Sequence, residues 1–105
     1  MMNQQSQNLF SQQPQMDSKF QYTDEELILR FQEGDEQAYI ELVKRYKDKL
    51  INFVYRLVSD RDQAEDIIQD TMLKLYTHKH YYKNIAKFST WIYTIAGNFA
   101  KTELR

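Results

Sequence analysis

Aromatic and basic residues share one stretch of this sequence, YYKNIAKFSTWIYTIAGN at residues 81–98, and no acidic residue interrupts it. The acid-free run is longer than this stretch, because no Asp or Glu occurs between Asp70 and Glu103. Aromatic faces stack on unpaired bases and lysines follow phosphates, so this combination suits single-stranded nucleic acid. A protein core would explain the rings but not the missing carboxylates. The run therefore raises the hypothesis of a polyanion-binding surface.

The rings fall into two groups. Trp91 and Phe99 share a helical face with Ile92 and Ile95, which favours a place in the core. Two tyrosines instead lie in a polar connection and are the better candidates for stacking on bases. That connection contains Lys79, Tyr81, Tyr82, Lys83, Asn84 and Lys87.

Two polar residues extend this surface along the following helix. Asn98 and Lys101 are three residues apart and lie on its polar side. Asparagine can make paired hydrogen bonds to an adenine edge, and lysine can neutralise a phosphate. The sequence therefore predicts that a base-reading loop is continued by one helix face.

A second candidate surface is acidic. The predicted helix over residues 62–78 carries a polar stripe opposite its apolar face, together with a leucine off the core side. The stripe and the leucine comprise Asp62, Glu65, Asp66, Gln69, Asp70 and Leu73. Such a stripe is a plausible docking surface for a basic partner helix, but taken alone the default interpretation is a plain solvated face.

Residues that could perform catalysis are sparse. His78 and His80 flank Lys79, with no acidic residue nearby in sequence to orient them and too few ligands for zinc. The pair is interpreted as exposed. The sequence has no cysteine. It also has no glycine-rich phosphate-binding loop, because it contains only two glycines. The sequence predicts no enzymatic activity, no cofactor and no metal site.

Charge is segregated along the 105 residues. Residues 1–70 hold 8 Lys and Arg against 14 Asp and Glu, a balance of −6, whereas residues 71–105 hold 6 against 1, a balance of +5, which gives the net −1. This favours a basic face for a polyanion and a separate acidic face, with chance clustering as the alternative. The missing cysteines, and the lack of a signal peptide or a long apolar run, suit a soluble cytoplasmic protein without membrane insertion.

One helical domain is predicted after a disordered, glutamine-rich leader at residues 1–22. Thr23 opens a short helix with a capping box to Glu26, and Gly34 ends it. Asp35 caps the second helix, Ser59 or Asp60 the third, and Ser89 or Thr90 the fourth. The expected core faces are Tyr39, Leu42, Val43, Tyr46, Leu50, Phe53, Val54 and Leu57; Ala64, Ile67, Ile68, Thr71, Met72 and Leu75; and Trp91, Ile92, Ile95, Ala96 and Phe99. The fold class is an all-α, compact four-helix domain over residues 23–105.

Two linked motifs, AEDIIQDTMLKLY and KFSTWIYTIAGNFAKTELR, resemble region 2 of sigma-70-family transcription initiation factors, best the extracytoplasmic-function (ECF) branch. The resemblance covers about residues 24–105. It implies a non-enzymatic domain that binds the clamp helices of core RNA polymerase and recognises and melts the promoter −10 element. An anti-sigma protein is a further expected partner.

When the family's functional residues are matched to this sequence one by one, the resemblance implies two sites. Polymerase binding is expected at Glu65, Asp66, Gln69, Asp70 and Leu73. DNA binding, including capture of a flipped base of the non-template strand, is expected at Tyr82, Lys83, Asn84, Lys87, Ser89, Thr90, Asn98, Lys101 and Arg105. The first helices and the acidic half are expected to lie away from the DNA.

The sequence departs from the family pattern at Met72, Gly97 and Thr102, where Phe, a basic residue and Asp are usual. The family's region 4 domain, which reads the −35 element, is expected to be absent from this chain, by excision or natural truncation. Two alternatives stay open: a regulator that occupies the polymerase clamp without productive promoter recognition, and a helical interaction module whose main partner is an anti-sigma protein.

Overall fold

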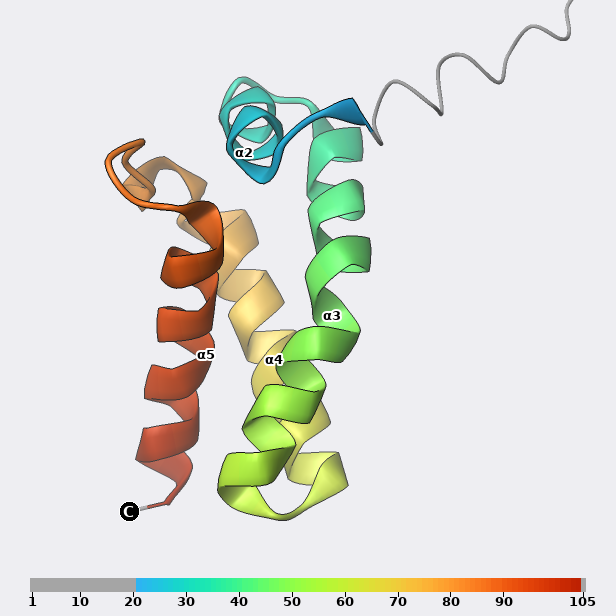
Figure 1. Ribbon diagram of the computed structural model, residues 1–105, viewed down its shortest axis with the longest axis vertical. Helices are drawn as coiled ribbons and strands as arrows, with labels where there is room; N and C mark the ends of the chain where they lie inside the picture. Colours follow the sequence, from blue (N-terminus) through green and yellow to red (C-terminus); the bar gives the residue numbers. More distant parts are fainter. Residues whose placement is uncertain (1–20, 105) are drawn as a thin grey trace, which may run out of the picture.

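The computed structural model describes residues 21–104, which form four α-helices and a short 3₁₀ helix. The helices are α2 (Asp24–Gln32), α3 (Glu36–Val58), α4 (Arg61–Thr77) and α5 (Phe88–Glu103), and the 3₁₀ helix η2 (Lys79–Tyr81) follows α4. Helices α3, α4 and α5 run along the long axis, and α2 crosses one end of them (Figure 1). The all-α four-helix class is confirmed for the described residues. The predicted leader falls on residues 1–20, which lie outside them, and on Gln21 and Tyr22.

The first three helices begin where their capping residues predict. Thr23 and Glu26 form the reciprocal capping box of α2, at 2.8 and 3.1 Å. The Asp35 carboxylate accepts from Gln37 N in α3, and Asp60 rather than Ser59 caps α4. Gly34 has φ +106°, a left-handed conformation that favours glycine, so the chain turns sharply there between α2 and α3.

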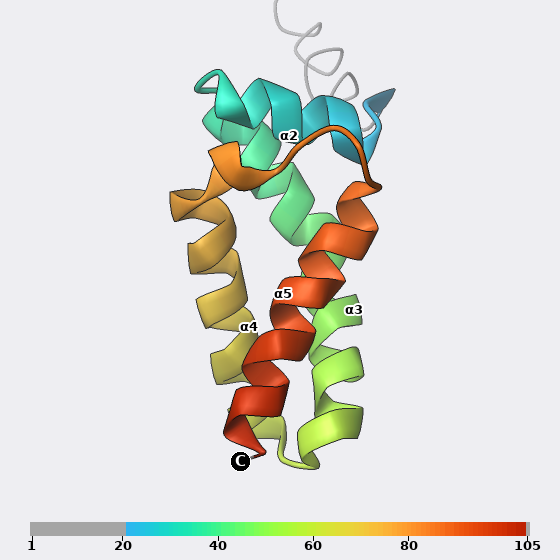
Figure 2. The same cartoon turned by 90° about the vertical axis from the view of Figure 1, so that its left-hand side faces the viewer.

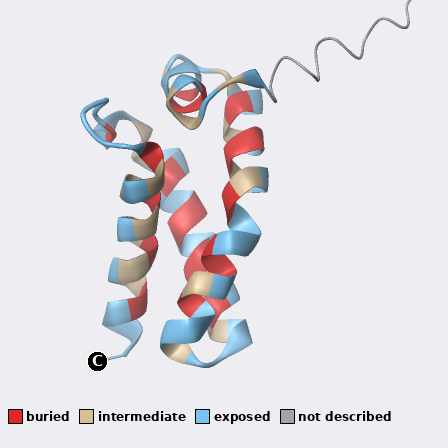
Figure 3. Ribbon diagram, viewed as in Figure 1, coloured by how far each residue is buried: buried red, intermediate tan, exposed pale blue. Residues whose placement is uncertain are grey.

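The core lies between the helices, with buried faces pointing inward (Figure 3). All six predicted core residues of α4 are buried. On α3 the prediction was wrong for Leu57, which is 41% exposed in the last turn before the corner into α4. On α5 the fully buried positions are Phe88, Ile92, Ala96 and Ala100, while Trp91, Ile95 and Phe99 are only partly buried.

Polar contacts fix α2 against α3. Arg45 forms ion pairs with Asp24 at 2.9 Å and with the buried Glu41 at 3.0 Å, and the Tyr46 hydroxyl donates to Asp24. Because these groups are largely removed from water, each charge has an opposite charge or a hydrogen-bond donor beside it. Helix α2 is therefore held in one orientation, at the end of the bundle where the chain passes from α4 to α5.

Candidate nucleic-acid and partner interface

The connection between α4 and α5, here called the α4–α5 loop (residues 78–87), is an ordered structure. After η2, the Tyr82 hydroxyl reaches across the loop and donates to Ala86 O at 2.5 Å. Ile85 N donates to Lys83 O at 2.6 Å. These contacts bend the chain so that residues 83–87 form an exposed tip between α2 and α5 (Figure 2).

The two tyrosines of the loop lie in opposite environments. Tyr81 is 70% exposed, and its ring lies perpendicular to that of His78, with the centroids 4.9 Å apart, so most of the side chain is open to solvent. Tyr82 is only 3% exposed, and its ring packs against Phe88 and Trp91. The prediction of Tyr82 as a stacking ring is wrong in this structure, because its ring forms part of the core under the loop. Burial, and then the nearby Glu25 charge, raise the pKa of Tyr82 above its ordinary value.

Helix α2 contacts both ends of the α4–α5 loop. The Gln32 side-chain amide donates to Lys79 O at 2.7 Å and to Tyr82 O at 3.2 Å. At the other end, the Glu25 carboxylate accepts from Phe88 N at 2.7 Å. The helix α5 therefore starts at Phe88, with a cap supplied by another helix. The prediction that Ser89 or Thr90 caps α5 is wrong, since both lie inside its first turn.

An open hollow of about 520 Å³ lies between the loop tip and the start of α2. It brings together three predicted DNA-binding residues, Asn84, Lys87 and Ser89. Four further lining residues were not assigned from the sequence: Asp24, Glu25, Ile85 and Ala86. The expectation that the acidic first helix lies away from this surface is corrected, because two of its carboxylates form one wall of the hollow.

Ile85 is the most exposed large apolar side chain among the described residues, at 92%. It lies at the loop tip beside Asn84, and Lys83 is exposed there as well. Sequence reasoning overlooked it, although an isoleucine between polar neighbours and outside any helical period was a usable signal. An exposed apolar tip suits contact with a base face or another apolar group.

One exposed face of α5 continues from the loop. Thr90, Asn98 and Lys101 are all exposed, and the unassigned Thr94 completes this face at helical spacing. Asn98 is about 14 Å farther along the axis than Ser89, at about 1.5 Å per residue, so it does not share the loop hollow. Arg105, the last predicted DNA-binding residue, lies outside the described residues.

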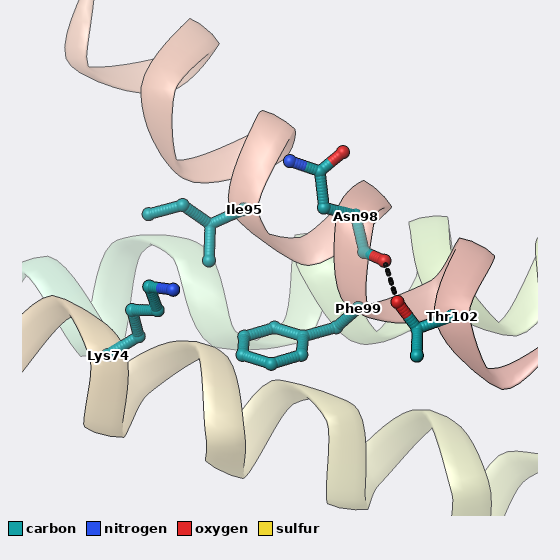
Figure 4. A pocket seen from close by; sticks show the side chains of 5 residues that line it. All are labelled: Lys74, Ile95, Asn98, Phe99 and Thr102. Atoms are coloured by element: carbon teal, nitrogen blue, oxygen red, sulfur yellow. Dashed lines mark hydrogen bonds between the residues drawn. The ribbon is translucent and has the colours of Figure 1, made fainter.

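A second hollow, of about 250 Å³, lies beside Asn98 (Figure 4). It is lined by Lys74, Ile95, Asn98, Phe99 and Thr102. The Lys74 ammonium group lies 5.8 Å from the Phe99 ring centroid. The Thr102 hydroxyl donates to the backbone oxygen of Asn98 at 3.1 Å. The side-chain amide of Asn98 takes no part in this bond and points away from Thr102 (Figure 4). Partly buried Phe99 thus forms the floor of a groove between α4 and α5.

The acidic stripe of α4 lies on the outside of the bundle. Asp66, Gln69 and Asp70 are exposed, and Leu73 is 60% exposed beside them. Glu65 pairs with Arg61 at 3.6 Å, an exposed contact that stabilises little by itself. A single exposed leucine is ordinary on a protein surface, so this face is compatible with a docking surface and equally with a solvated one.

Grooves flank the stripe on both sides. Toward α3, a hollow of about 370 Å³ is lined by Val43, Lys47, Ile51, Glu65, Ile68, Gln69 and Met72. Toward α5, one of about 290 Å³ is lined by Asp70, Leu73, Lys74, Thr77, His78 and Phe99. The stripe therefore forms a ridge with partly apolar grooves beside it, a shape that an elongated partner such as a helix can straddle.

The two histidines lie in the α4–α5 loop. His78 Nδ1 lies 2.8 Å from the Thr77 hydroxyl, and His80 is exposed. Across residues 21–104, no three His, Asp or Glu side chains are grouped closely enough to hold a metal ion. Within the same residues, no helix is long and apolar enough to cross a membrane.

Comparison with known proteins identifies this arrangement. Residues 42–105 match the family Sigma-70 region 2. The chain is 36% identical over 84 residues to the RNA polymerase sigma-H factor of Pseudomonas aeruginosa, covering 80% of this chain and 44% of that protein. It is 38% identical over 84 residues to the ECF RNA polymerase sigma-E factor of Escherichia coli (strain K12), with the same coverage. For the ECF sigma factor SigW of Bacillus subtilis, identity is 35% over 78 residues, covering 74% and 42%.

A solved structure gives the same result. The fold resembles an NMR structure of the complex formed by an engineered region 2 of sigmaE with GTAAAA, with a TM-score of 0.72 and 40% identity over 80% of this chain and 87% of that one. This chain spans less than half the length of the full relatives named above. The motif resemblance in the sequence is confirmed: the chain belongs to the sigma-70 region 2 family, in its ECF branch.

Proposed function

We propose that this chain is the part of a bacterial sigma factor that binds core RNA polymerase and recognises and melts the promoter −10 element. The observation that carries the proposal is the hollow in which the α4–α5 loop and the start of α5 bring Asn84, Lys87 and Ser89 together. The engineered region 2 of sigmaE, 40% identical to this chain, was solved in complex with GTAAAA. The occupant proposed here is an unpaired base of a similar single strand.

The exposed groups suit a melted strand better than a duplex. Extruding a base costs a few kcal/mol, whereas stacking one on an aromatic ring contributes about 1–3 kcal/mol. Tyr81 offers such a ring, Asn84 offers an amide to a base edge, and Lys83 and Lys87 offer charge to phosphates. Stacking on Tyr81 would roughly offset the cost of extruding the base. The contacts of Asn84, Lys83 and Lys87 would then bind the open strand better than the duplex, and this difference in binding shifts the equilibrium toward melted DNA.

The α5 face extends the proposed DNA contact. Thr90, Asn98 and Lys101 lie along one exposed side of α5. A DNA strand that leaves the hollow along this helix would pass these residues. Asn98 carries an exposed amide for a base edge, and Lys101 a charge for a phosphate. Arg105 extends the same proposal beyond the described residues.

The polymerase contact is proposed for the acidic ridge of α4. Asp66, Gln69 and Asp70 would bind basic and polar groups of the largest-subunit clamp helices, with Leu73 as the apolar anchor and Glu65 at the edge. Exposed acids attract a basic partner while it approaches, and a buried apolar anchor supplies affinity. A cytoplasmic location follows from this role and is part of the proposal.

One observation favours an alternative. Asp24 and Glu25 line the same hollow as the loop and would repel a phosphate that came close. A regulator that occupies the polymerase clamp without productive promoter recognition, itself bound by an anti-sigma protein, would tolerate these acids. Oligonucleotide binding separates the two functions, because only the first requires it.

The test of the DNA contact is a fluorescence anisotropy titration of labelled single-stranded GTAAAA at several salt concentrations. The double variant Asn84→Ala/Lys87→Ala should bind at least tenfold more weakly and lose part of the salt dependence, which for single strands is about 0.7 in log–log slope per phosphate contact. The matched control is Asn52→Ala/Lys44→Ala, which changes the same residue types at exposed positions of α3. Equal affinity of the two double variants would refute the loop as the base reader.

The test of the polymerase contact is a pull-down with purified core RNA polymerase. Asp66→Lys should abolish capture, because it places a like charge against the basic partner. Asp48→Lys, an exposed acid on α3, is the matched control and should bind as the unmodified chain does. Capture of the Asp66→Lys variant at the control's level would remove the docking assignment.

A further inference from the structure

Gln32, the last residue of α2, makes two hydrogen bonds to a segment about fifty positions later in the sequence. Its side-chain nitrogen donates to Lys79 O at 2.7 Å and to Tyr82 O at 3.2 Å. An amide nitrogen carries two hydrogens, so one side chain can serve both carbonyl groups. The two acceptors lie at the start and just beyond the end of η2, and Gln32 therefore bridges this turn from outside.

Few hydrogen bonds within the turn hold its backbone, although the Tyr82 ring that follows it packs into the core. Residues 79–82 hold one weak internal hydrogen bond, from Tyr82 N to Lys79 O at 3.4 Å, besides the bond from Tyr81 N to His78 O at 2.9 Å. The Lys79 ammonium group rests 4.3 Å from the ring centroid of Phe31, which again belongs to α2. Contacts from α2 thus hold the backbone of η2 and one of its side chains.

The turn determines where the loop tip lies. Tyr82 follows η2 directly, is buried, and bonds Ala86 through its hydroxyl. Glu25, at the other end of α2, accepts from Phe88 N. The exposed residues 83–87 are thus suspended between two anchor points that both belong to one nine-residue helix.

We propose that Gln32 is a positioning residue that presets the α4–α5 loop in the shape that receives an unpaired base. This inference rests on the proposed function. Gln32 is half-buried under η2 and does not line the hollow, so it acts through Lys79 and Tyr82 and not on the nucleic acid. A loop already held in its bound shape does not lose conformational entropy when the strand arrives, and this raises affinity without a new contact.

The perturbation is Gln32→Met, which keeps the length and volume of the side chain and removes both donors. The control is Gln37→Met, at an exposed position of α3. Three quantities are measured for each: anisotropy of labelled single-stranded GTAAAA with its salt dependence, hydrogen exchange of backbone amides in residues 78–88, and capture by core RNA polymerase.

The expected result has three parts. Gln32→Met should weaken oligonucleotide binding about tenfold, the size of effect that two lost hydrogen bonds produce. The slope of affinity against salt should be unchanged, because no phosphate contact is removed. Amide exchange should speed up mainly in the loop and polymerase capture should stay close to that of Gln37→Met, while the melting temperature falls by only several degrees.

Other results would overturn the inference. One is an oligonucleotide affinity of Gln32→Met equal to that of Gln37→Met. The other is faster amide exchange throughout the bundle together with a large fall in melting temperature, which would make Gln32 a general structural residue. If the unmodified chain binds no oligonucleotide, the proposed DNA contact fails and the positioning role falls with it. If that chain binds and Gln32→Met binds equally well, only the positioning role fails.

Discussion

The Glu25 carboxylate has two opposing roles: it should stabilise the fold and disfavour the binding of a phosphate. Its carboxylate caps α5 at Phe88 N, at 2.7 Å, and it also forms the wall of the hollow that holds Lys87 and Ser89. The cap stabilises the fold, whereas the charge would oppose a phosphate of the proposed strand in the hollow. Two substitutions separate these effects: Glu25→Gln keeps an oxygen acceptor but removes the charge, while Glu25→Ala removes both.

The magnitudes follow from the contacts. Loss of a capping acceptor costs about 1 kcal/mol, and loss of a carboxylate at a helix N-terminus costs about 0.3–1 kcal/mol. For a domain of this size, about 1 kcal/mol lowers the melting temperature by roughly 4–8 °C. Glu25→Ala should therefore melt about 5–10 °C lower, and Glu25→Gln only a few degrees lower. Removing one negative charge about 8 Å from a phosphate in water gains about 0.5 kcal/mol, or about twofold in affinity.

The assay is a thermal melt followed by circular dichroism, paired with anisotropy titration of single-stranded GTAAAA in low salt. Glu25→Gln should bind about twofold more tightly than the unmodified chain, and this gain should vanish in about 1 M salt, where the screening length is about 3 Å. Glu33→Gln, an exposed acid at the other end of α2, is the control. Weaker binding by Glu25→Gln would refute the reasoning, because the carboxylate would then be a contact to the nucleic acid. Unchanged melting of Glu25→Ala would refute the cap.

Three further predictions address the core, the ridge and the loop. Burial first, and then the hydrogen bond to Asp24, raise the pKa of Tyr46. Because the folded state keeps this proton when the unfolded state begins to lose it near pH 10, stability should fall as pH rises above about 10. Urea unfolding between pH 8 and 11 should show a shallower fall for Tyr46→Phe, and equal slopes would contradict this origin. Leu73→Ser should weaken capture by core polymerase at least fivefold while the melting temperature stays unchanged, since the side chain is 60% exposed; full capture would remove its anchor role. Tyr81→Ala should lower affinity for single-stranded GTAAAA by about 1–3 kcal/mol in an anisotropy titration, whereas unaltered affinity would show that its ring does not stack.

Much of the fold was predictable because its determinants are local. Thr23, Asp35 and Asp60 lie within three residues of the amides they cap, and the apolar period of α4 gave all six of its buried residues. Gly34 has the positive φ that its place between two helices indicated. In each case the information lies within one or two turns of helix, which is the range over which a sequence pattern is informative.

The errors came from contacts between distant residues. The cap of α5 is Glu25, sixty-three positions before Phe88, so a search among nearby serines and threonines could not find it. Tyr82 lies in a polar stretch but fills a space between Phe88 and Trp91 that exists only after the helices pack. The acid-free run is real in the sequence, yet Glu25 brings a carboxylate to it in three dimensions.

The proposed function requires one small domain to bind polymerase and an unpaired strand at the same time, through different surfaces. The direct measurement is anisotropy of labelled single-stranded GTAAAA with this chain, followed by addition of core RNA polymerase, with Asp66→Lys in parallel. We expect a further rise in anisotropy for the unmodified chain, because the ridge of α4 and the hollow of the α4–α5 loop are lined by separate residues, and no further rise for Asp66→Lys. Release of the oligonucleotide by polymerase, or an equal rise with both chains, would contradict it.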